Sequence, residues 1–243
     1  NADIDPRDYK AATKHATTKS ERDTPEGTIR ADYEYTLIAE TLNAKKPFLG
    51  VCGGMQRLNV LLGGSLHQHV PDLTGNELHQ QDKLDIAPFV PVIYVKTEAG
   101  TQLEKIGKGT YMPAHDTPLG VVPENSFHHQ AVDNLGRGLR AAAYSVEAKP
   151  DVRIVEAIEA DPAVFKDQFV VGTQWHPEFG ASELSGKLFQ ALTEKSAEYA
   201  RANPRLSEAM HETAISMAAS PSWQERIRKS QTVASKPTGR GAA

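Results

Sequence analysis

The stretch "KPFLGVCGGMQRLNVLLGG", residues 46–64, contains the only cysteine of the 243-residue chain, Cys52. The apolar run at 47–51 is typical of a short buried strand, and the run at 53–62 is typical of a helix. The glycine pair at 63–64 is a helix stop signal. The sequence therefore predicts that the cysteine lies at a tight turn from a strand into a helix.

A cysteine at such a turn is well placed to act as a nucleophile. Small neighbours leave room for a substrate, and Gly50, Gly53 and Gly54 flank Cys52 on both sides. The N-terminus of the following helix carries partial positive charge, which favours the reactive thiolate. The alternative is that Cys52 is a small buried hydrophobic residue, a common role for cysteine.

A second stretch, "VVGTQWHPEF" at 170–179, strengthens the hypothesis of a nucleophile. A thiolate needs a base and a group that orients the base. His176 directly follows a predicted strand, and Glu178 comes two residues later, on the same side of an extended chain. By itself the histidine is more typical of a surface residue beside a proline turn. Together with Cys52, the pattern predicts a Cys–His–Glu triad.

Helical and strand patterns alternate along the rest of the chain, which predicts an α/β protein. Apolar residues at helical spacing predict amphipathic helices at 28–44 and 181–202, and two loop-rich regions are expected at 1–27 and 108–131. Further strands are predicted at 88–96, 138–145, 152–160 and 168–175, with Pro91 favouring an edge position for the first.

Composition excludes several classes of protein. The net charge of −4 gives no sign of a nucleic-acid surface, and no apolar run approaches the roughly 18 residues of a membrane span. A single cysteine excludes an internal disulfide and favours a reducing compartment. The polar opening "NADIDPRDYK" does not resemble a signal peptide. These features predict a cytoplasmic protein with no membrane or nucleic-acid partner.

Four motifs in the same order resemble one known family. They are "ADIDPRDY" at 2–9, "LGVCGGMQRLNVLLGGSLHQHVPD" at 49–72, "NSFHHQAV" at 125–132 and "VGTQWHPEF" at 171–179. Together they are similar to the class I glutamine amidotransferase superfamily, and within it to the peptidase C26 family. The best-known members of that family include γ-glutamyl-γ-aminobutyrate hydrolases of putrescine breakdown, a branch of polyamine catabolism.

The resemblance implies a flavodoxin-like, three-layer α/β/α fold with a mostly parallel sheet. It also implies that Cys52 is the nucleophile, His176 the general acid and base, and Glu178 the group that orients the histidine. The backbone N–H of Gly53 would line the oxyanion hole. Substrate-binding roles are implied for Gln56, His128, His129 and Gln130.

The sequence departs from the family pattern in two ways. Many relatives carry an arginine after the nucleophile, where this chain has Gly53, a change that spares the backbone donor. Family members also begin with further strand–helix units that end in a Gly-Gly pair, the second oxyanion donor. We expect the sheet to lack these N-terminal units. The chain is then a fragment, a relative in which another segment takes their place, or a truncated and inactive relative.

The expected reaction is hydrolysis of the γ-glutamyl amide bond of a small compound through a cysteine thioester, releasing glutamate. It requires no cofactor and no metal, because His67 and His69 lack a suitably spaced carboxylate or cysteine partner. One alternative is a glutaminase subunit that delivers ammonia to a partner synthase, and a homodimer is left open. The expected domains are a hydrolase domain at 1–203 and a helical extension with a frayed tail at 204–243.

Overall fold

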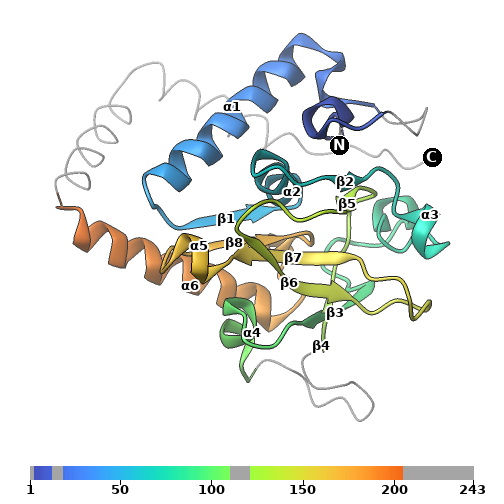
Figure 1. The fold of residues 1–243 in the computed structure, drawn as a ribbon. Coiled ribbons are helices and arrows are strands. Elements are labelled where there is room, and N and C mark those ends of the chain that lie inside the picture. The colour runs from blue at the N-terminus through green and yellow to red at the C-terminus, as the bar shows by residue number, and fades with distance from the viewer. Residues whose placement is uncertain (1–2, 13–18, 110–120, 205–243) are drawn as a thin grey trace, which may run out of the picture. The chain divides into compact units, whose positions relative to one another are not determined.

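The computed structural model describes residues 3–12, 19–109 and 121–204 (Figure 1). The chain divides into a unit of residues 1–196 and a unit of residues 197–243. Apart from Pro204, the helical extension predicted for 204–243 lies outside the described residues. No helix in the described ranges combines the length and the apolar character that crossing a bilayer requires.

One sheet of eight strands forms the centre of the described structure, and helices of very different lengths connect the strands. The strands are β1 (Phe48–Val51), β2 (Leu66–His67), β3 (Ile93–Thr97), β4 (Val121–Glu124), β5 (Ala131–Val132), β6 (Leu139–Ser145), β7 (Val155–Ala160) and β8 (Val170–Thr173). The α-helices are α1 (Pro25–Asn43), α2 (Gly53–Leu61), α3 (Pro71–Thr74), α4 (Gln102–Gly107), α5 (Pro162–Phe165) and α6 (Glu183–Ala202). Four 3₁₀ turns are η1 (Pro6–Tyr9), η2 (Glu21–Asp23), η3 (Gln81–Leu84) and η4 (Pro177–Phe179).

The α/β class is confirmed, but the expectation of a mostly parallel sheet is wrong for the described strands. Their order is β1-β8-β7-β6-β3-β4, and β5 joins β7 to β2. Only the β1–β8 pair is parallel, whereas every other described pair is antiparallel. A parallel pair needs a long crossover connection. The β7–β8 connection contains only the four-residue helix α5, and no helix joins β6 to β7, so these neighbours run in opposite directions.

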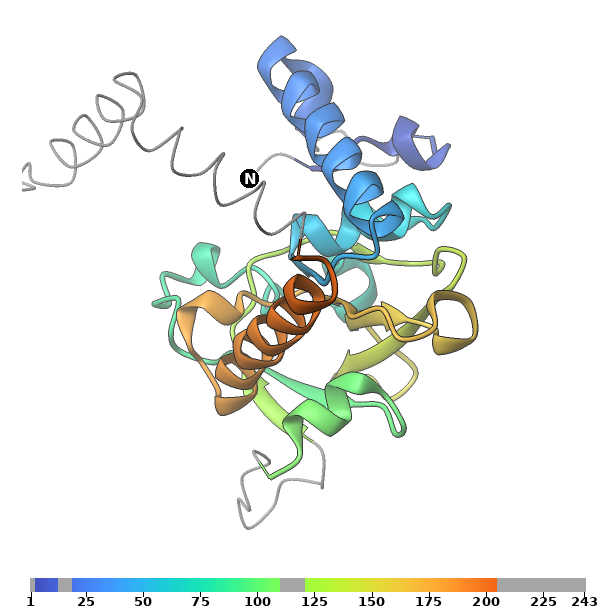
Figure 2. The same cartoon turned by 90° about the vertical axis from the view of Figure 1, so that its left-hand side faces the viewer.

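Helices cover both faces of the sheet, as the three-layer prediction requires. On one face Ile38 of α1 and Met55 of α2 belong to the same apolar cluster as Ile158 of β7. On the other face Leu103 of α4 and Leu184 of α6 pack in a second cluster. In both views α1 and α4 lie on opposite sides of the sheet (Figures 1 and 2).

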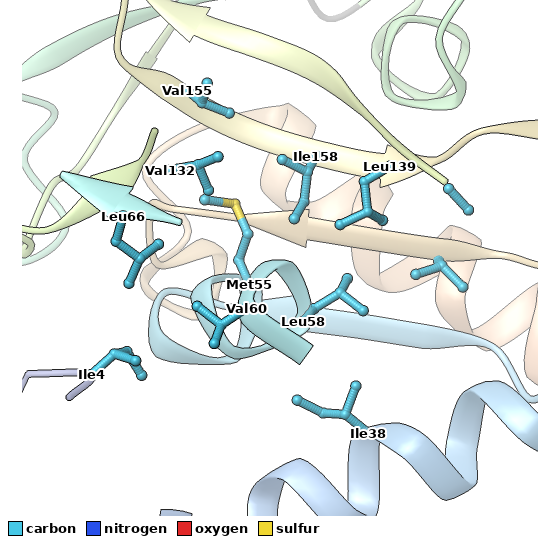
Figure 3. Close-up of a cluster of buried hydrophobic side chains, with 12 residues drawn as sticks. Ile4, Ile38, Met55, Leu58, Val60, Leu66, Val132, Leu139, Val155 and Ile158 are labelled. Atoms are coloured by element: carbon cyan, nitrogen blue, oxygen red, sulfur yellow. The ribbon is translucent and has the colours of Figure 1, made fainter. Parts of the chain in front are cut away.

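Strand β7 is buried along its whole length. Ile158 contributes to the α1–α2 side, and its neighbour Ala157 contributes to the other side, as the alternation of a strand requires. Figure 3 shows Ile158 pointing toward Met55 and Leu58 of α2, and Val155 belongs to the same cluster. This packing holds α2, and with it the turn that precedes α2, against the middle of the sheet.

Helix α1 forms where predicted, but one of its apolar stripes is not buried. Ile29, Tyr33 and Leu37 are 69%, 67% and 52% exposed, whereas Ile38 is buried at 4%. Pro25 at the first helical turn and Thr24, whose side chain accepts from the N–H of Gly27, begin the helix. Helical spacing therefore located the helix but did not identify its buried face.

Two regions expected to be loops contain regular structure. The range 108–131 includes β4 and the start of β5, and the range 1–27 includes η1, η2 and the first turn of α1. Strand β4 forms because it pairs antiparallel with β3, with Ile93 opposite Glu124. Strand β3 begins after Pro91 and lies between β6 and β4, away from the sheet edge that this proline suggested. Pairing with distant strands thus decided what the local pattern did not.

Candidate active site

Cys52 lies between β1 and α2, at the predicted strand-to-helix turn. Its backbone has φ 50° and ψ −106°, in the positive-φ region that residues other than glycine seldom adopt. A Cβ at Gly50 would lie 2.9 Å from the backbone carbon of Gly54, so this position has room only for glycine. A Cβ at Gly54 would meet nothing within 4 Å. Of these two flanking glycines, only Gly50 is required by close packing.

The thiol is held in place by strand β8 and the residue that follows it. The N–H of Cys52 donates to the carbonyl of Thr173 at 2.7 Å, and the Gln174 amide Nε2 lies 3.6 Å from the sulfur. Burial raises the pKa of the thiol to about 11, although a hydrogen bond from the N–H of Gly53 acts in the opposite direction. The expectation that the helix N-terminus yields a thiolate is therefore not met. Cys52 is a neutral thiol near pH 7.

His176 follows β8 and has one occupied and one free ring nitrogen. Its Nδ1 lies 2.7 Å from the Glu178 carboxylate Oε1. Because a carboxylate only accepts hydrogen bonds, Nδ1 carries the proton, and the neutral ring has its lone pair on Nε2. That Nε2 is buried and has no hydrogen-bond partner among the residues that the structure describes. The Glu178 side chain is 46% exposed, so solvent screens the attraction between its charge and the imidazole.

His176 is held in place by two residues from the segment after β4, which contact its backbone and its ring, and by Phe179. The side-chain amide of Asn125 accepts from the N–H of His176 at 2.9 Å and donates to its carbonyl at 2.8 Å. The ring of Phe127 meets the imidazole edge-on at 5.7 Å, and Phe179 lies 5.8 Å away. Neither Asn125 nor Phe127 was predicted as a site residue, because 51 residues separate Asn125 from His176 and no local pattern connects them.

A cavity of about 1070 Å³ brings the predicted residues together. Cys52, Gly53 and His176 line it, and Glu178 is the one predicted residue that does not. Gln56, His128, His129 and Gln130, which were predicted to bind substrate, also line the cavity. Cys52 and His176 therefore line one cavity, and the Glu178 carboxylate holds Nδ1 of the imidazole.

The glutamine side chains of the predicted binding set are engaged in internal hydrogen bonds. The amide Nε2 of Gln56 donates to the carbonyl of Gln130 at 2.9 Å and to Oε1 of Gln174 at 3.1 Å. The side chain of Gln130 holds the backbone of Ile4, accepting from its N–H at 2.9 Å and donating to its carbonyl at 3.2 Å. These amides support the cavity wall and position Gln174, which contacts the thiol.

The two histidines of the set also have partners. The Nε2 of His129 lies 2.5 Å from the Asp3 carboxylate, and its Nδ1 lies 3.3 Å from Nδ1 of His69. His128 is buried, and its Nδ1 donates to the carbonyl of Gln130 at 2.9 Å. Gln174 was missed as a site residue, although its place two residues before His176 on an extended segment was a weak signal for it.

The comparisons with known proteins agree on one family. The family model described as Peptidase C26 matches residues 1–178. The protein NtpR of Enterococcus hirae is 37% identical over 157 residues, covering 63% of this chain and 56% of its own length. A Mycobacterium tuberculosis protein named "Putative glutamine amidotransferase" is 36% identical over 181 residues, covering 72% and 50%. The chain thus spans about half the length of the curated relatives it matches.

A named hydrolase and a solved structure are more distant. The γ-glutamyl-γ-aminobutyrate hydrolase of Escherichia coli is 29% identical over 171 residues, covering 64% of this chain and 56% of that protein. A glutamine amidotransferase from Thermotoga maritima has a TM-score of 0.42 at 16% identity, covering 88% of this chain and 85% of that chain.

The α/β fold and the cavity that joins a turn cysteine to a histidine define a glutamine amidotransferase-like protein. The family model covers well over half of the chain, so the chain belongs to the peptidase C26 family.

Proposed function

We propose that this chain is a cysteine-dependent hydrolase of the γ-glutamyl amide bond in a small compound such as γ-glutamyl-γ-aminobutyrate. One observation carries the proposal. The buried Nε2 of His176 has no partner and belongs to the cavity that Cys52 lines, while Nδ1 is held by Glu178. A nucleophile, a base and a base-orienting carboxylate are the parts that acyl transfer to a thiol requires.

The neutral thiol determines how the first step proceeds. Since the pKa of Cys52 is raised, Nε2 of His176 accepts the thiol proton as the sulfur bonds to the γ-carbonyl carbon. The carbonyl oxygen gains negative charge and accepts the hydrogen bond that Gly53 N–H donates in the free protein to the thiol. The proton on His176 then passes to the leaving amine as the C–N bond breaks.

The second step regenerates the thiol. Nε2 of His176 accepts a proton from water, and the hydroxyl adds to the γ-glutamyl thioester. The C–S bond breaks, the sulfur takes back the proton, and glutamate leaves. Glu178 stabilises the imidazolium in both steps, and its solvent exposure makes this contribution smaller than that of a buried carboxylate.

A release assay tests the proposal. The substrates are γ-glutamyl-γ-aminobutyrate, a γ-glutamyl anilide, glutamine and, as a matched control, the α-glutamyl isomer of the first. We expect cleavage of the γ-linked amides, total loss in Cys52→Ser and a loss of about 10- to 100-fold in Glu178→Gln. Melting temperatures check that each variant folds.

Two results would contradict the proposal. If Cys52→Ser kept near-normal turnover, the thiol would not be the nucleophile. If the α-glutamyl isomer were cleaved as fast as the γ-linked compound, the substrate class would be wrong. Turnover of glutamine alone would favour the glutaminase alternative over a hydrolase of substituted amides.

A further inference from the structure

A second group of titratable side chains adjoins the cavity through His128, and it takes no part in the proton transfers of the proposed reaction. His79, His128 and Glu156 come from three distant parts of the chain, and each is at most 5% exposed. Nδ1 of His79 lies 3.2 Å from Nε2 of His128 and 3.3 Å from Oε1 of Glu156. Nε2 of His128 lies 3.4 Å from the same oxygen. Three donor atoms thus form a nearly equilateral triangle.

The outer hydrogen bonds of both histidines direct their lone pairs into this triangle. Nε2 of His79 lies 2.9 Å from Oε1 of Glu147, and Nδ1 of His128 lies 2.9 Å from the carbonyl of Gln130. Both partners only accept hydrogen bonds, so these two nitrogens carry the protons. When both rings are neutral, the opposite nitrogens, Nδ1 of His79 and Nε2 of His128, face each other as two electron-pair donors. Histidine ligands of metals are held in the same way, by a carboxylate or a carbonyl on the outer nitrogen.

Glu156 supplies an independent observation. Its side chain is fully buried in β7, and neither carboxylate oxygen makes a hydrogen bond of acceptable geometry. The two histidine nitrogens lie 3.3 and 3.4 Å from Oε1, and with neutral rings they are further electron-pair donors beside the carboxylate. The Ser126 hydroxyl lies 3.3 Å from Nδ1 of His79 and 3.2 Å from the carbonyl of the same residue, so one hydroxyl proton serves two acceptors there. The Glu156 carboxylate therefore requires a positive charge in the triangle, which either a bound cation or a protonated His79 supplies.

The spacing of the donor atoms indicates which ion fits. A tetrahedral zinc site with bonds of about 2.0–2.1 Å places neighbouring ligand atoms about 3.3–3.4 Å apart. An octahedral ion with bonds of about 2.1 Å requires about 3.0 Å between neighbours. The three measured separations of 3.2, 3.3 and 3.4 Å match one face of the tetrahedron. Two imidazoles and one carboxylate also suit Zn²⁺.

We propose that His79, His128 and Glu156 bind a zinc ion that ties the segment before η3, the segment after β4 and strand β7 together behind the cavity. Glu147 is a positioning residue that fixes the ring of His79. The ion takes no part in the proposed hydrolysis, because neither Cys52 nor His176 is among its ligands, and its three protein ligands leave the fourth position of the tetrahedron to water. The proposal stands whether or not the chain hydrolyses γ-glutamyl amides.

Zinc binding by the full-length chain tests this proposal. The Cys52→Ser variant is used throughout, so that the thiol cannot bind the metal. The protein is stripped with a chelator, mixed with zinc chloride and desalted, and the retained zinc is measured. We expect one zinc ion per chain, a higher melting temperature with zinc, and an intense visible spectrum typical of tetrahedral Co²⁺ when cobalt replaces zinc.

Further variants separate this site from others. Glu156→Gln should lose zinc binding, and Glu147→Gln, which removes only the carboxylate behind His79, should weaken it about 10- to 100-fold. Glu124→Gln is the matched control because Glu124 is also fully buried in the sheet, with Ser182 and Ser185 as its partners. The Glu124→Gln variant should bind zinc with the same affinity as the Cys52→Ser parent. If Glu156→Gln fails to fold, the affinity of Glu147→Gln decides the matter.

The proposal would be overturned by a stripped protein that retains no zinc. In that case the cluster is an imidazolium–carboxylate network. Burial lowers the pKa of His79, but hydrogen bonds to Glu147 and Glu156 outweigh burial and raise that pKa to about 9. Equal zinc affinity in Glu147→Gln and Glu124→Gln would also overturn it, because the metal would then lie elsewhere.

Discussion

Two histidine–glutamate pairs of similar geometry lie in very different surroundings. The ring of His176 contacts Glu178 at 2.7 Å, and the ring of His79 contacts Glu147 at 2.9 Å. In the first pair the histidine lines the cavity, and the carboxylate side chain is 46% exposed. In the second pair the two side chains are 1% and 7% exposed. The difference lies in what the other ring nitrogen faces.

His176 lines the same cavity as Cys52, whereas Nδ1 of His79 lies beside a second imidazole and a carboxylate. A nitrogen without a partner at a cavity can accept and return a proton. A buried nitrogen whose lone pair faces other electron-pair donors requires a positive charge between them. The same pair of residue types therefore supports proton transfer in one place and cation binding in the other, and each function can be removed separately.

The largest effect is expected for His176→Asn. This change removes the proton acceptor for the thiol, so turnover of a γ-glutamyl amide should fall about 1,000-fold or more. The melting temperature should change little, because the ring lies at the cavity rather than in a core. The control His67→Asn alters a partly exposed histidine that pairs with Asp133 and should keep full activity. If turnover in His176→Asn fell by less than tenfold, His176 would not be the proton acceptor, and the two histidine–glutamate pairs would not differ in function.

His79→Asn should affect stability instead. Without metal, His79 is the cation that offsets Glu156 and Glu147, and removing one partner of a buried ion pair costs about 3–5 kcal/mol. Urea unfolding with a chelator present measures this loss, with His67→Asn again as the control. A free energy of unfolding within about 1 kcal/mol of the parent would show that His79 is not the charged member of the cluster.

The smallest effect concerns the thiol that His176 faces. Because the pKa of Cys52 is raised to about 11, the thiolate fraction should rise about tenfold for each pH unit below that value. Alkylation of the free protein by iodoacetamide should therefore accelerate about tenfold from pH 7 to pH 8 and again to pH 9. A rate that is constant over this range would instead reveal a preformed thiolate–imidazolium pair.

The sequence predicted those parts of the candidate site whose geometry depends on a few consecutive residues. Cys52 at the strand-to-helix turn and the His176–Glu178 contact were both predicted, because a few consecutive residues decide each of them. The strands β1, β6, β7 and β8 were also found within three residues of their bounds at one or both ends. Apolar runs between glycine and proline identify such buried strands, whatever their neighbours are.

Only the tertiary structure decided which distant groups meet. The predicted substrate-binding role of Gln56 remains a prediction, but its amide reaches Gln130 and Gln174 across more than seventy residues of sequence. The antiparallel neighbours of β7 and the exposed stripe of α1 likewise depend on which elements pack together.

The same limit applies to the charge of Cys52 and to the second histidine–glutamate pair. Sequence predicted a thiolate from the helix N-terminus, yet burial, which no local pattern reports, outweighs that effect. His79, His128 and Glu156 are separated by 49 and 28 residues, so no motif spacing connects them. The sequence by itself determined the turn position of Cys52 and the contact between His176 and Glu178, because both are set by a few consecutive residues. The fold alone decided the protonation of the thiol and the convergence of the buried donors, because both depend on what surrounds a side chain in space.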